Sequence, residues 1–263
     1  MKIFGGYLFD LDGTVYLGDY PLPGAAETIR ELMKQGCRCV FLSNKPIEPV
    51  TKYQEKLNAM GIPVKKENII NSSIVMAQYL KGIKEGLRIY LIGEKPLADE
   101  LINAGCIITD NPLEAEYVVV SWDREFNYKK LNDAMQAICN GARLVATHPD
   151  RTCPVPGGVV PDAAGMIAAV EAVTGKKCEE IVGKPSPWTV TAALNRMGLP
   201  KEDVLMVGDR LETDIKMGKM VGIKTALTLT GVTRREDLEH SEIQPDYILE
   251  TLADLLKGEI YEE

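Results

Sequence analysis

Short apolar runs alternate with longer stretches of helical periodicity along the whole chain. The runs at residues 6–9, 38–42, 204–207 and 225–229 predict β-strands. Amphipathic patterns predict helices at 25–35 and 50–60, and Gly61 stands where a helix commonly ends. Strands that alternate with helices are typical of an α/β protein with a largely parallel sheet.

The middle of the chain carries a second series of the same kind. Strands are expected at residues 88–92, 117–121 and 143–147, and helices near 97–104, 128–140 and 163–173. About a hundred residues are enough for a separate domain. We therefore predict a core made of residues 1–81 and 179–263, with an inserted domain at residues 82–178.

Composition narrows the class of protein. Of the 263 residues, 45% are hydrophobic and 26% are charged, which is typical of a globular protein. The apolar runs are too short to cross a bilayer, and no secretory signal is recognisable, so we expect a cytoplasmic protein and no membrane partner. The net charge of −8 disfavours binding to nucleic acid, whereas a small phosphate ester stays compatible with it.

Cysteine and histidine are arranged without a metal-binding pattern. The six cysteines form no Cys-x-x-Cys pair, and the two histidines have no ligand-like neighbours. We expect free thiols and neither a zinc site nor a disulfide framework.

The strongest chemical signal is the sequence Phe-Asp-Leu-Asp-Gly-Thr at residues 9–14, directly after the first strand. Ligands of open α/β sheets bind beyond the carboxyl ends of the strands. Asp10 and Asp12 can face the same side there, and Gly13 lets the backbone approach an anion closely. A plain turn is the alternative, while a calcium loop is disfavoured because its glycine and later acidic ligand are misplaced.

Two further motifs could hold a phosphate group. Ser43 and Asn44 follow the second strand, where a hydroxyl and an amide can bind phosphoryl oxygens, although the same residues suit an ordinary turn. Lys184 stands between Gly183 and Pro185, where its ammonium can neutralise a phosphate. An isolated lysine is more often a solvated surface residue, and no nucleotide-binding P-loop precedes it.

The fourth motif follows the strand at residues 204–207. Asp209 and Asp214 are carboxylates at a strand end, which suits a hard cation that prefers oxygen ligands. An acidic helix start could explain one of them, but not both.

The four motifs in this order resemble the haloacid dehalogenase superfamily of phosphohydrolases, over the whole chain. The insert between Ser43 and Lys184 is similar to that of the subfamily with a large α/β cap domain on a Rossmann-like, doubly wound core. Residues 91–94, 146–150 and 182–186 are similar to bacterial sugar- and nucleotide-phosphate phosphatases. Residues 161–167 most resemble the phosphosugar phosphatase found with arabinose-utilisation genes.

The resemblance implies a role for each motif residue. Asp10 would attack phosphorus and bind Mg²⁺, and Asp12 would act as general acid and base while its main-chain carbonyl touches the metal. The other expected roles are phosphoryl binding by Ser43 and Asn44, charge neutralisation by Lys184, metal binding by Asp209 and orientation of the cluster by Asp214. An aspartate nucleophile suits phosphoryl transfer because it is ionised at neutral pH.

Two positions depart from the family pattern. His148 replaces the asparagine of an Asn-Pro-Asp sequence in the cap, and Asp162 stands where many relatives carry glycine. His148, Asp150, Arg151 and Cys153 are candidates for contact with substrate, and a rigid turn at Pro149 is the alternative.

These features together predict a Mg²⁺-dependent phosphatase for small phosphate esters, with sugar phosphates preferred. A nucleotide phosphatase, a phosphomutase and a catalytically silent sugar-phosphate sensor stay open as alternatives. A dehalogenase is disfavoured, because carbon–halogen attack has no need of Asp12, Gly13 or Asp209. The cap also offers a surface on which two subunits could pair as a homodimer.

Overall fold

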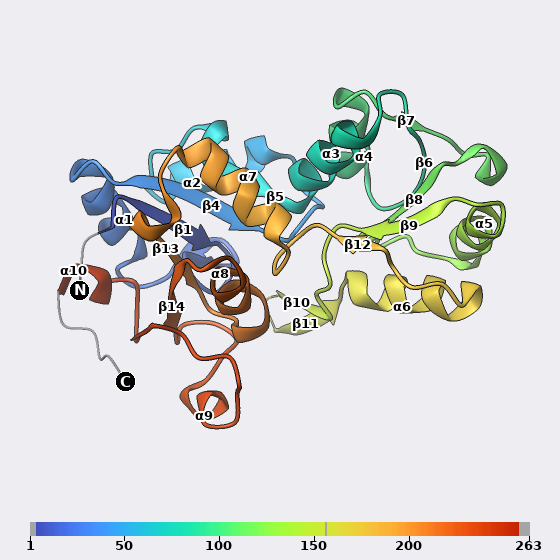
Figure 1. Ribbon diagram of the computed structural model, residues 1–263. Helices are drawn as coiled ribbons and strands as arrows, with labels where there is room; N and C mark the ends of the chain where they lie inside the picture. Colours follow the sequence, from blue (N-terminus) through green and yellow to red (C-terminus); the bar gives the residue numbers. More distant parts are fainter. Residues whose placement is uncertain (1–3, 156, 258–263) are drawn as a thin grey trace. The chain divides into compact units, whose positions relative to one another are not determined.

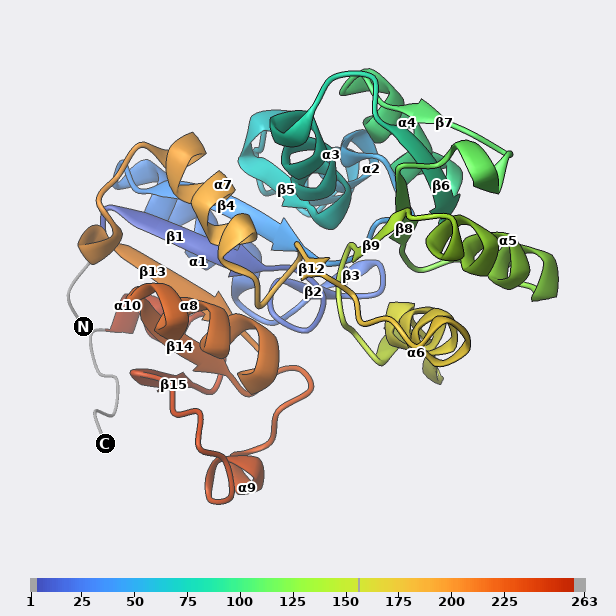
Figure 2. The same cartoon turned by 45° about the vertical axis from the view of Figure 1, so that its right-hand side comes forward.

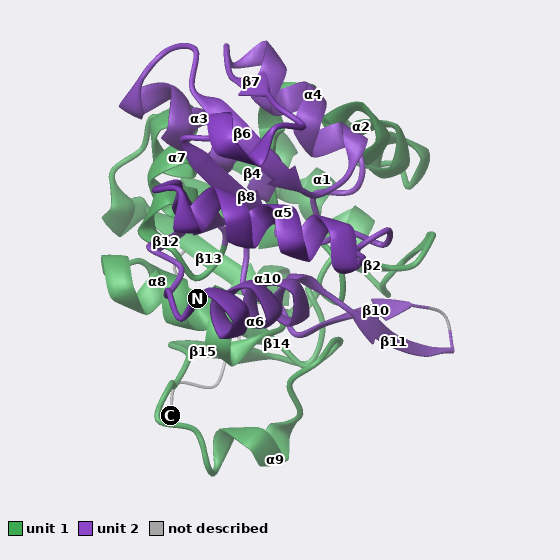
Figure 3. Cartoon of the chain, turned by 90° about the vertical axis from the view of Figure 1, so that its right-hand side faces the viewer, with its two compact units in different colours: residues 1–43, 50–70, 184–263 green, residues 44–49, 71–183 purple. Residues whose placement is uncertain are grey.

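The computed structural model describes residues 4–155 and 157–257, which fold into two compact units. Of the described residues, unit 1 comprises 4–43, 50–70 and 184–257, and unit 2 comprises 44–49, 71–155 and 157–183 (Figure 3). Each unit contains a parallel β-sheet with helices packed against it, so the expected α/β class is confirmed.

The sheet of unit 1 has six strands in the order β15-β14-β13-β1-β4-β5 (Figure 1). Its central strands are buried along their whole length, as parallel strands covered on both faces must be. Phe9 of β1 stacks on Phe41 of β4, with ring centroids 5.9 Å apart. The strands are β1 (Gly6–Asp10), β4 (Arg38–Ser43), β5 (Ile69–Asn71), β13 (Val204–Gly208), β14 (Lys224–Thr228) and β15 (Tyr247–Leu249).

The helices of unit 1 lie on both faces of this sheet. Helices α7 and α8 pack side by side on one face, with α1 on the other (Figure 2). The helices are α1 (Ala25–Lys34), α2 (Val50–Ala59), α7 (Pro187–Met197), α8 (Lys216–Val221), α9 (Arg235–Leu238) and α10 (Asp254–Lys257). A small hairpin of β2 (Tyr16–Leu17) and β3 (Tyr20–Pro21), two 3-10 turns (Lys66–Asn68, Lys201–Asp203) and a π-helical turn (Leu211–Ile215) complete the unit.

The sheet of unit 2 is also parallel, in the order β12-β9-β8-β6-β7. Its apolar core includes β8, which is buried at all four positions. The strands are β6 (Arg88–Ile92), β7 (Ile107–Ile108), β8 (Tyr117–Val120), β9 (Arg143–Ala146) and β12 (Glu180–Ile181). The helices are α3 (Ser72–Ile83), α4 (Lys95–Asn103), α5 (Tyr128–Cys139) and α6 (Ala163–Thr174), with a 3-10 turn at Pro112–Glu114 and a hairpin of β10 (Thr152–Val155) and β11 (Gly158–Pro161).

The edges of the two units differ from those expected at residues 81/82 and 178/179. Helix α3 belongs to unit 2 because it packs against α4. Strand β12 extends the unit 2 sheet because it pairs with β9. Residues 44–49 also join unit 2, where their carbonyls accept hydrogen bonds from Asn71, Ser72 and Ser73 at the start of α3.

Among the described helices, none combines the length and the apolar character that a membrane span requires.

Candidate active site

The motif residues of unit 1 gather at the carboxyl edge of its sheet. Asp10 is the last residue of β1 and lies opposite Leu42 of β4 in the parallel register, so that Ser43 follows at the end of the neighbouring strand. On the other side of β1, β13 ends at Gly208, directly before Asp209. Parallel strands bring these residues to one edge, where ligands of such sheets bind.

Lys184 links two of the carboxylates in a buried ion-pair network. Its Nζ donates to Oδ1 of Asp10 and, at 2.7 Å, to Oδ1 of Asp214. Carboxylate oxygens of Asp10, Asp209 and Asp214 all lie within 4.8 Å of one another, and all three residues are buried. The structure therefore brings together four residues that the sequence spreads over more than two hundred positions.

Burial changes the pKa values of Asp10 and Asp209. Desolvation, together with the neighbouring charges of Asp214 and Asp209, raises the pKa of Asp10 well above its usual range despite the opposing effect of Lys184. Desolvation and the charge of Asp214 raise the pKa of Asp209 to about 7. Burial by itself would lower the pKa of Lys184, but the charges of Asp10 and Asp214 raise it, so the lysine stays protonated.

This cluster fits a divalent cation. When all three carboxyl groups are ionised, the single ammonium leaves two negative charges uncompensated in a buried place, and all the donor atoms are oxygens, as Mg²⁺ prefers. The hydroxyls of Thr14, on the loop that carries Asp12, and of Thr213, on the π-helical turn that carries Asp214, are buried without a hydrogen-bond partner among the described residues. Buried polar atoms of this kind usually bind water or an ion.

A short segment after β14, residues 230–233, holds Asp209 in place. The amide of Val232 donates to Oδ2 of Asp209 at 2.6 Å, and the Thr230 hydroxyl donates to the carbonyl oxygen of Gly13 at 2.7 Å. A Cβ atom on Gly231 would lie 2.0 Å from Oδ2 of Asp209, so only glycine fits there with the carboxylate in this position. This segment could not be recognised from the sequence, because neither its residue types nor its spacing indicates a site.

The remaining motif residues differ in their surroundings. Asp12 is half-buried two residues after Asp10, and Ser43 is buried at the end of β4. Asn44 belongs to unit 2, where its side-chain amide donates to both carboxylate oxygens of Asp150, at 3.2 and 3.3 Å. Its side chain therefore has a protein partner, in addition to the phosphate contact expected of this residue.

Comparisons with known proteins agree with this architecture. The family model of the haloacid dehalogenase-like hydrolases matches residues 7–107, and a second model of such hydrolases matches residues 181–255. The sugar-phosphatase AraL of Bacillus subtilis is 40% identical over 252 residues, which cover 96% of this chain and 92% of the relative.

Two solved structures of similar proteins show the same fold. The p-nitrophenyl phosphatase from Archaeoglobus fulgidus has a TM-score of 0.92 and 33% identity, with 98% of this chain and 100% of the other covered. A glycerol phosphate phosphatase from Mycobacterium tuberculosis, solved in complex with magnesium, has a TM-score of 0.89 and 30% identity, over 96% of this chain and 76% of its own.

The chain belongs to the haloacid dehalogenase-like hydrolase family, as its motifs suggested. Within that family it is an enzyme of the phosphoric monoester hydrolase class, alongside phosphatases that it matches over nearly their whole length.

Proposed function

We propose that this enzyme hydrolyses small phosphate monoesters, above all sugar phosphates, with Mg²⁺ as cofactor and through an aspartyl-phosphate at Asp10. The observation that carries the proposal is the buried cluster of Asp10, Lys184, Asp209 and Asp214 at the carboxyl edge of the unit 1 sheet. The preference for sugar phosphates is supported by the similarity to AraL, which is named a sugar-phosphatase.

In the first half-reaction, a carboxylate oxygen of Asp10 attacks phosphorus and the ester P–O bond breaks. Asp12 donates a proton to the leaving oxygen. The hydroxyl of Ser43 and the peptide N–H of Asn44 bind phosphoryl oxygens, while the ammonium of Lys184 neutralises part of the charge that builds up in the transition state.

In the second half-reaction, Asp12 takes a proton from a water molecule that attacks phosphorus of the aspartyl-phosphate. The bond to Asp10 breaks, and the products are inorganic phosphate and the free carboxylate. A carboxylate suits both of Asp12's tasks, because it can give and take the same proton.

The cation site would be formed by Asp10, Asp209 and the main-chain carbonyl of Asp12, with Asp214 orienting the cluster through Lys184 and the amide of Arg210. A bound Mg²⁺ supplies charge neutralisation at the phosphoryl group and keeps the buried carboxylates ionised. That second effect matters because a nucleophile with a raised pKa is otherwise protonated and unreactive.

The test is phosphate release from p-nitrophenyl phosphate and a panel of sugar and nucleotide phosphates, with Mg²⁺ and with chelator. We expect Asp10→Asn to lower kcat by about 10³-fold or more, because it removes the nucleophile. Asp123→Asn is a matched control, since Asp123 is an equally buried aspartate of unit 2 that pairs with Lys130. Its turnover should stay close to that of the wild type.

The outcome of the panel decides between the alternatives. Faster turnover of nucleotides than of sugar phosphates would favour a nucleotide phosphatase. Binding of sugar phosphates without any release, by folded and Mg²⁺-loaded protein, would reject hydrolysis in favour of a sensor. A cytoplasmic location and a homodimer through unit 2 stay predictions of the sequence.

A further inference from the structure

Two residues of unit 2 adjoin the candidate active site along the chain. Asn44 directly follows Ser43, and Gly183 directly precedes Lys184. The placement of Ser43 and Lys184 therefore depends in part on what holds Asn44 and Gly183.

Both residues contact the same four-residue loop of unit 2, residues 147–150, which we term the anchor loop. The amide of Gly183 donates to the carbonyl oxygen of Thr147 at 2.6 Å, and the side chain of Asn44 binds Asp150. A Cβ atom on Gly183 would lie 2.7 Å from Oδ1 of Asn44 and 2.9 Å from Cβ of His148. Asn44, Gly183 and His148 are thus packed against one another.

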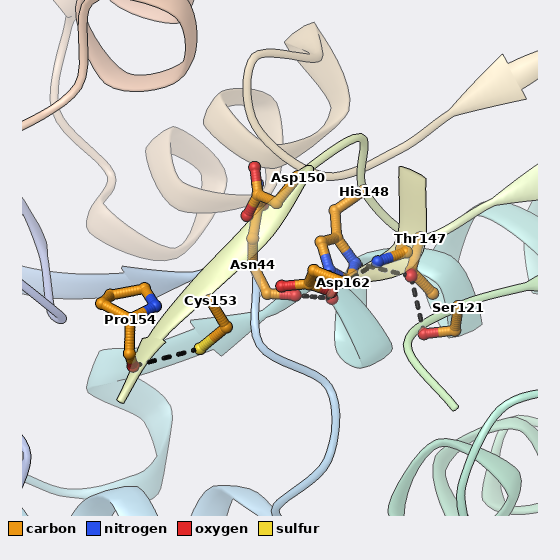
Figure 4. Close-up of polar contacts among 10 residues, drawn as sticks. Asn44, Ser121, Thr147, His148, Asp150, Cys153, Pro154 and Asp162 are labelled. Atoms are coloured by element: carbon orange, nitrogen blue, oxygen red, sulfur yellow. Dashed lines mark hydrogen bonds and ion pairs between the residues drawn. The ribbon is translucent and has the colours of Figure 1, made fainter. Parts of the chain in front are cut away.

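The anchor loop is fixed in turn by His148, which is fully buried (Figure 4). Its Nδ1 lies 2.8 Å from the hydroxyl of Thr147, which lies 2.7 Å from the hydroxyl of Ser121. Its Nε2 lies 2.8 Å from Oδ1 of Asp162, which also accepts from the amide of Ala163 at 2.6 Å. Both ring nitrogens are therefore bonded to neighbours that are themselves bonded, an arrangement that allows the ring only one orientation.

The loop and Asn44 are each tied to a helix of unit 2. The amide of Ala164, in the first turn of α6, donates to the carbonyl oxygen of Asp150 at 3.0 Å. The hydroxyl of Ser72, in the first turn of α3, donates to the carbonyl oxygen of Asn44 at 2.5 Å. Asn44 and Gly183, where the chain passes between the two units, are thereby connected to helices of unit 2.

We propose that His148 and Asp162 form a buried clamp whose task is to position Ser43 and Lys184 through the anchor loop. The inference rests on the proposed function, because it assigns the clamp to the same reaction. His148 and Asp162 contact each other directly, at 2.8 Å, and both side chains are buried. Phosphoryl transfer is sensitive to such positioning, since a displacement of about 1 Å can lower a rate about 10²-fold.

The first test compares His148→Leu, Asp162→Leu and the double variant. Each single variant breaks the clamp, so kcat should fall about 10- to 100-fold while KM stays within about threefold. The double variant should be no slower than the slower single variant, because both changes remove the same interaction. Arg124→Gln is the control: it breaks the exposed pair of Arg124 with Glu94 in the same unit and should leave kcat unchanged.

A milder pair of variants keeps the test decisive if the clamp variants fail to fold. Asp150→Ala removes the acceptor for Asn44, whereas Asp150→Asn retains one oxygen in the same place. We expect kcat to fall in the first and to recover largely in the second. Equal kcat in both, or a rise in KM that differs from one ester to the next, would overturn the proposal, since the latter indicates direct contact with substrate.

Hydrogen–deuterium exchange separates this proposal from the proposed function. Breaking the clamp should speed exchange of the amides at residues 44–49 and 180–183 in the intact chain, whether or not the protein turns over any ester. Unchanged exchange there would reject the clamp. If the wild type released no phosphate while the exchange became faster, the hydrolase assignment would fail and the structural role of the clamp would stand.

Discussion

The two units place polar residues at the same position of the same kind of sheet, with opposite results. At the carboxyl edge of the unit 1 sheet lie three buried carboxylates and one lysine. At the corresponding edge of the unit 2 sheet, Ser121 follows β8 and Thr147 follows β9, and a chain of short hydrogen bonds leads from them through His148 to Asp162.

The two edges differ in how completely their buried polar groups are balanced in charge or paired by hydrogen bonds. In unit 1 a single ammonium faces three carboxylates, and burial, together with the neighbouring carboxylates, raises the pKa of Asp10 and of Asp209. In unit 2 each group of the chain from Ser121 to Asp162 has a partner within 2.8 Å. A buried cluster with unbalanced charge is suited to bind a cation and an anionic substrate, whereas a cluster in which every polar group is hydrogen-bonded is suited to hold a loop rigid.

Lys184→Met should have the largest effect, because it removes the one cation of the unit 1 cluster. We expect kcat to fall about 10³-fold and the free energy of unfolding to fall by about 3 kcal/mol at pH 7 without Mg²⁺. The stability loss should shrink towards pH 5, because Asp10 and Asp209 have raised pKa values and become neutral as the pH falls. Urea unfolding at several pH values checks the stability, and p-nitrophenyl phosphate turnover checks the rate.

Lys130→Met in unit 2 is the control for Lys184→Met, because it also removes a lysine that pairs with a buried aspartate. Lys130 pairs with the buried Asp123 at 2.6 Å, so this variant also strands a buried carboxylate. It should lose stability but keep its kcat. If both lysine variants lost activity to the same degree, the distinction between the two edges would be wrong.

Gly231→Ala should weaken cation binding although no charged residue is substituted. The added Cβ atom must displace the Asp209 carboxylate from its place beside the Val232 amide. We expect Mg²⁺ affinity to fall about 10- to 100-fold, as when a group that orients a metal ligand is lost, with titration calorimetry as the measurement. Gly165→Ala in α6, where a Cβ atom meets nothing within 4 Å, should leave that affinity unchanged.

Much of the fold could be predicted from the sequence because its strands are continuous apolar runs. The strand expected at residues 88–92 is present as β6, and those at 38–42 and 204–207 each extend by one residue. Helix α3 was missed because it begins with Asn-Ser-Ser at residues 71–73 and contains Gly82, features that resemble a loop. Local pattern cannot show that Asn71 caps this helix or that the helix packs on α4, and the expected edge of the insert was displaced for the same reason.

The cluster could be predicted in part, because carboxylates that follow apolar strands must meet at one edge of a parallel sheet. That reasoning placed Asp10, Asp209 and Asp214 at strand ends. Lys184 was a separate candidate for phosphate binding, and the family resemblance joined the four residues in one site. It could not reveal the Gly231–Val232 contact or the bond between His148 and Asp162. Both depend on how loops fold back in space, which no periodicity encodes.

Thr147→Val tests the hydrogen-bond chain at the carboxyl edge of the unit 2 sheet. Replacing the hydroxyl leaves Nδ1 of His148 and the Ser121 hydroxyl without the partner they share, so stability should fall by about 2 kcal/mol. Ser121→Ala removes only the terminal hydroxyl of the chain and should cost about half as much. Thermal and urea unfolding of the three proteins would measure this, and a larger loss in Ser121→Ala would show that the hydrogen bonds are not ordered as described.

Replacing Asp246 has the smallest expected effect on stability. Within unit 1, the contribution of Asp246 to stability depends on pH in the opposite sense to that of Asp209. Burial alone would raise its pKa, but hydrogen bonds from Lys219, Lys224 and Thr225 outweigh burial and lower it well below the usual range. Its carboxylate therefore stabilises the folded state above the unfolded pKa of about 4, and this contribution disappears as the pH falls through the folded value. Asp246→Asn should lower stability by about 1 kcal/mol at pH 7, with a difference from the wild type that shrinks as the pH falls below about 4. Asp209, whose pKa is raised to about 7, should show the reverse: without Mg²⁺, its contribution favours folding increasingly as the pH falls below 7. Urea unfolding of Asp246→Asn and Asp209→Asn between pH 3 and 8 would separate the two signs, and curves of the same slope would mean that burial does not distinguish the carboxylates of the site from those elsewhere in the unit.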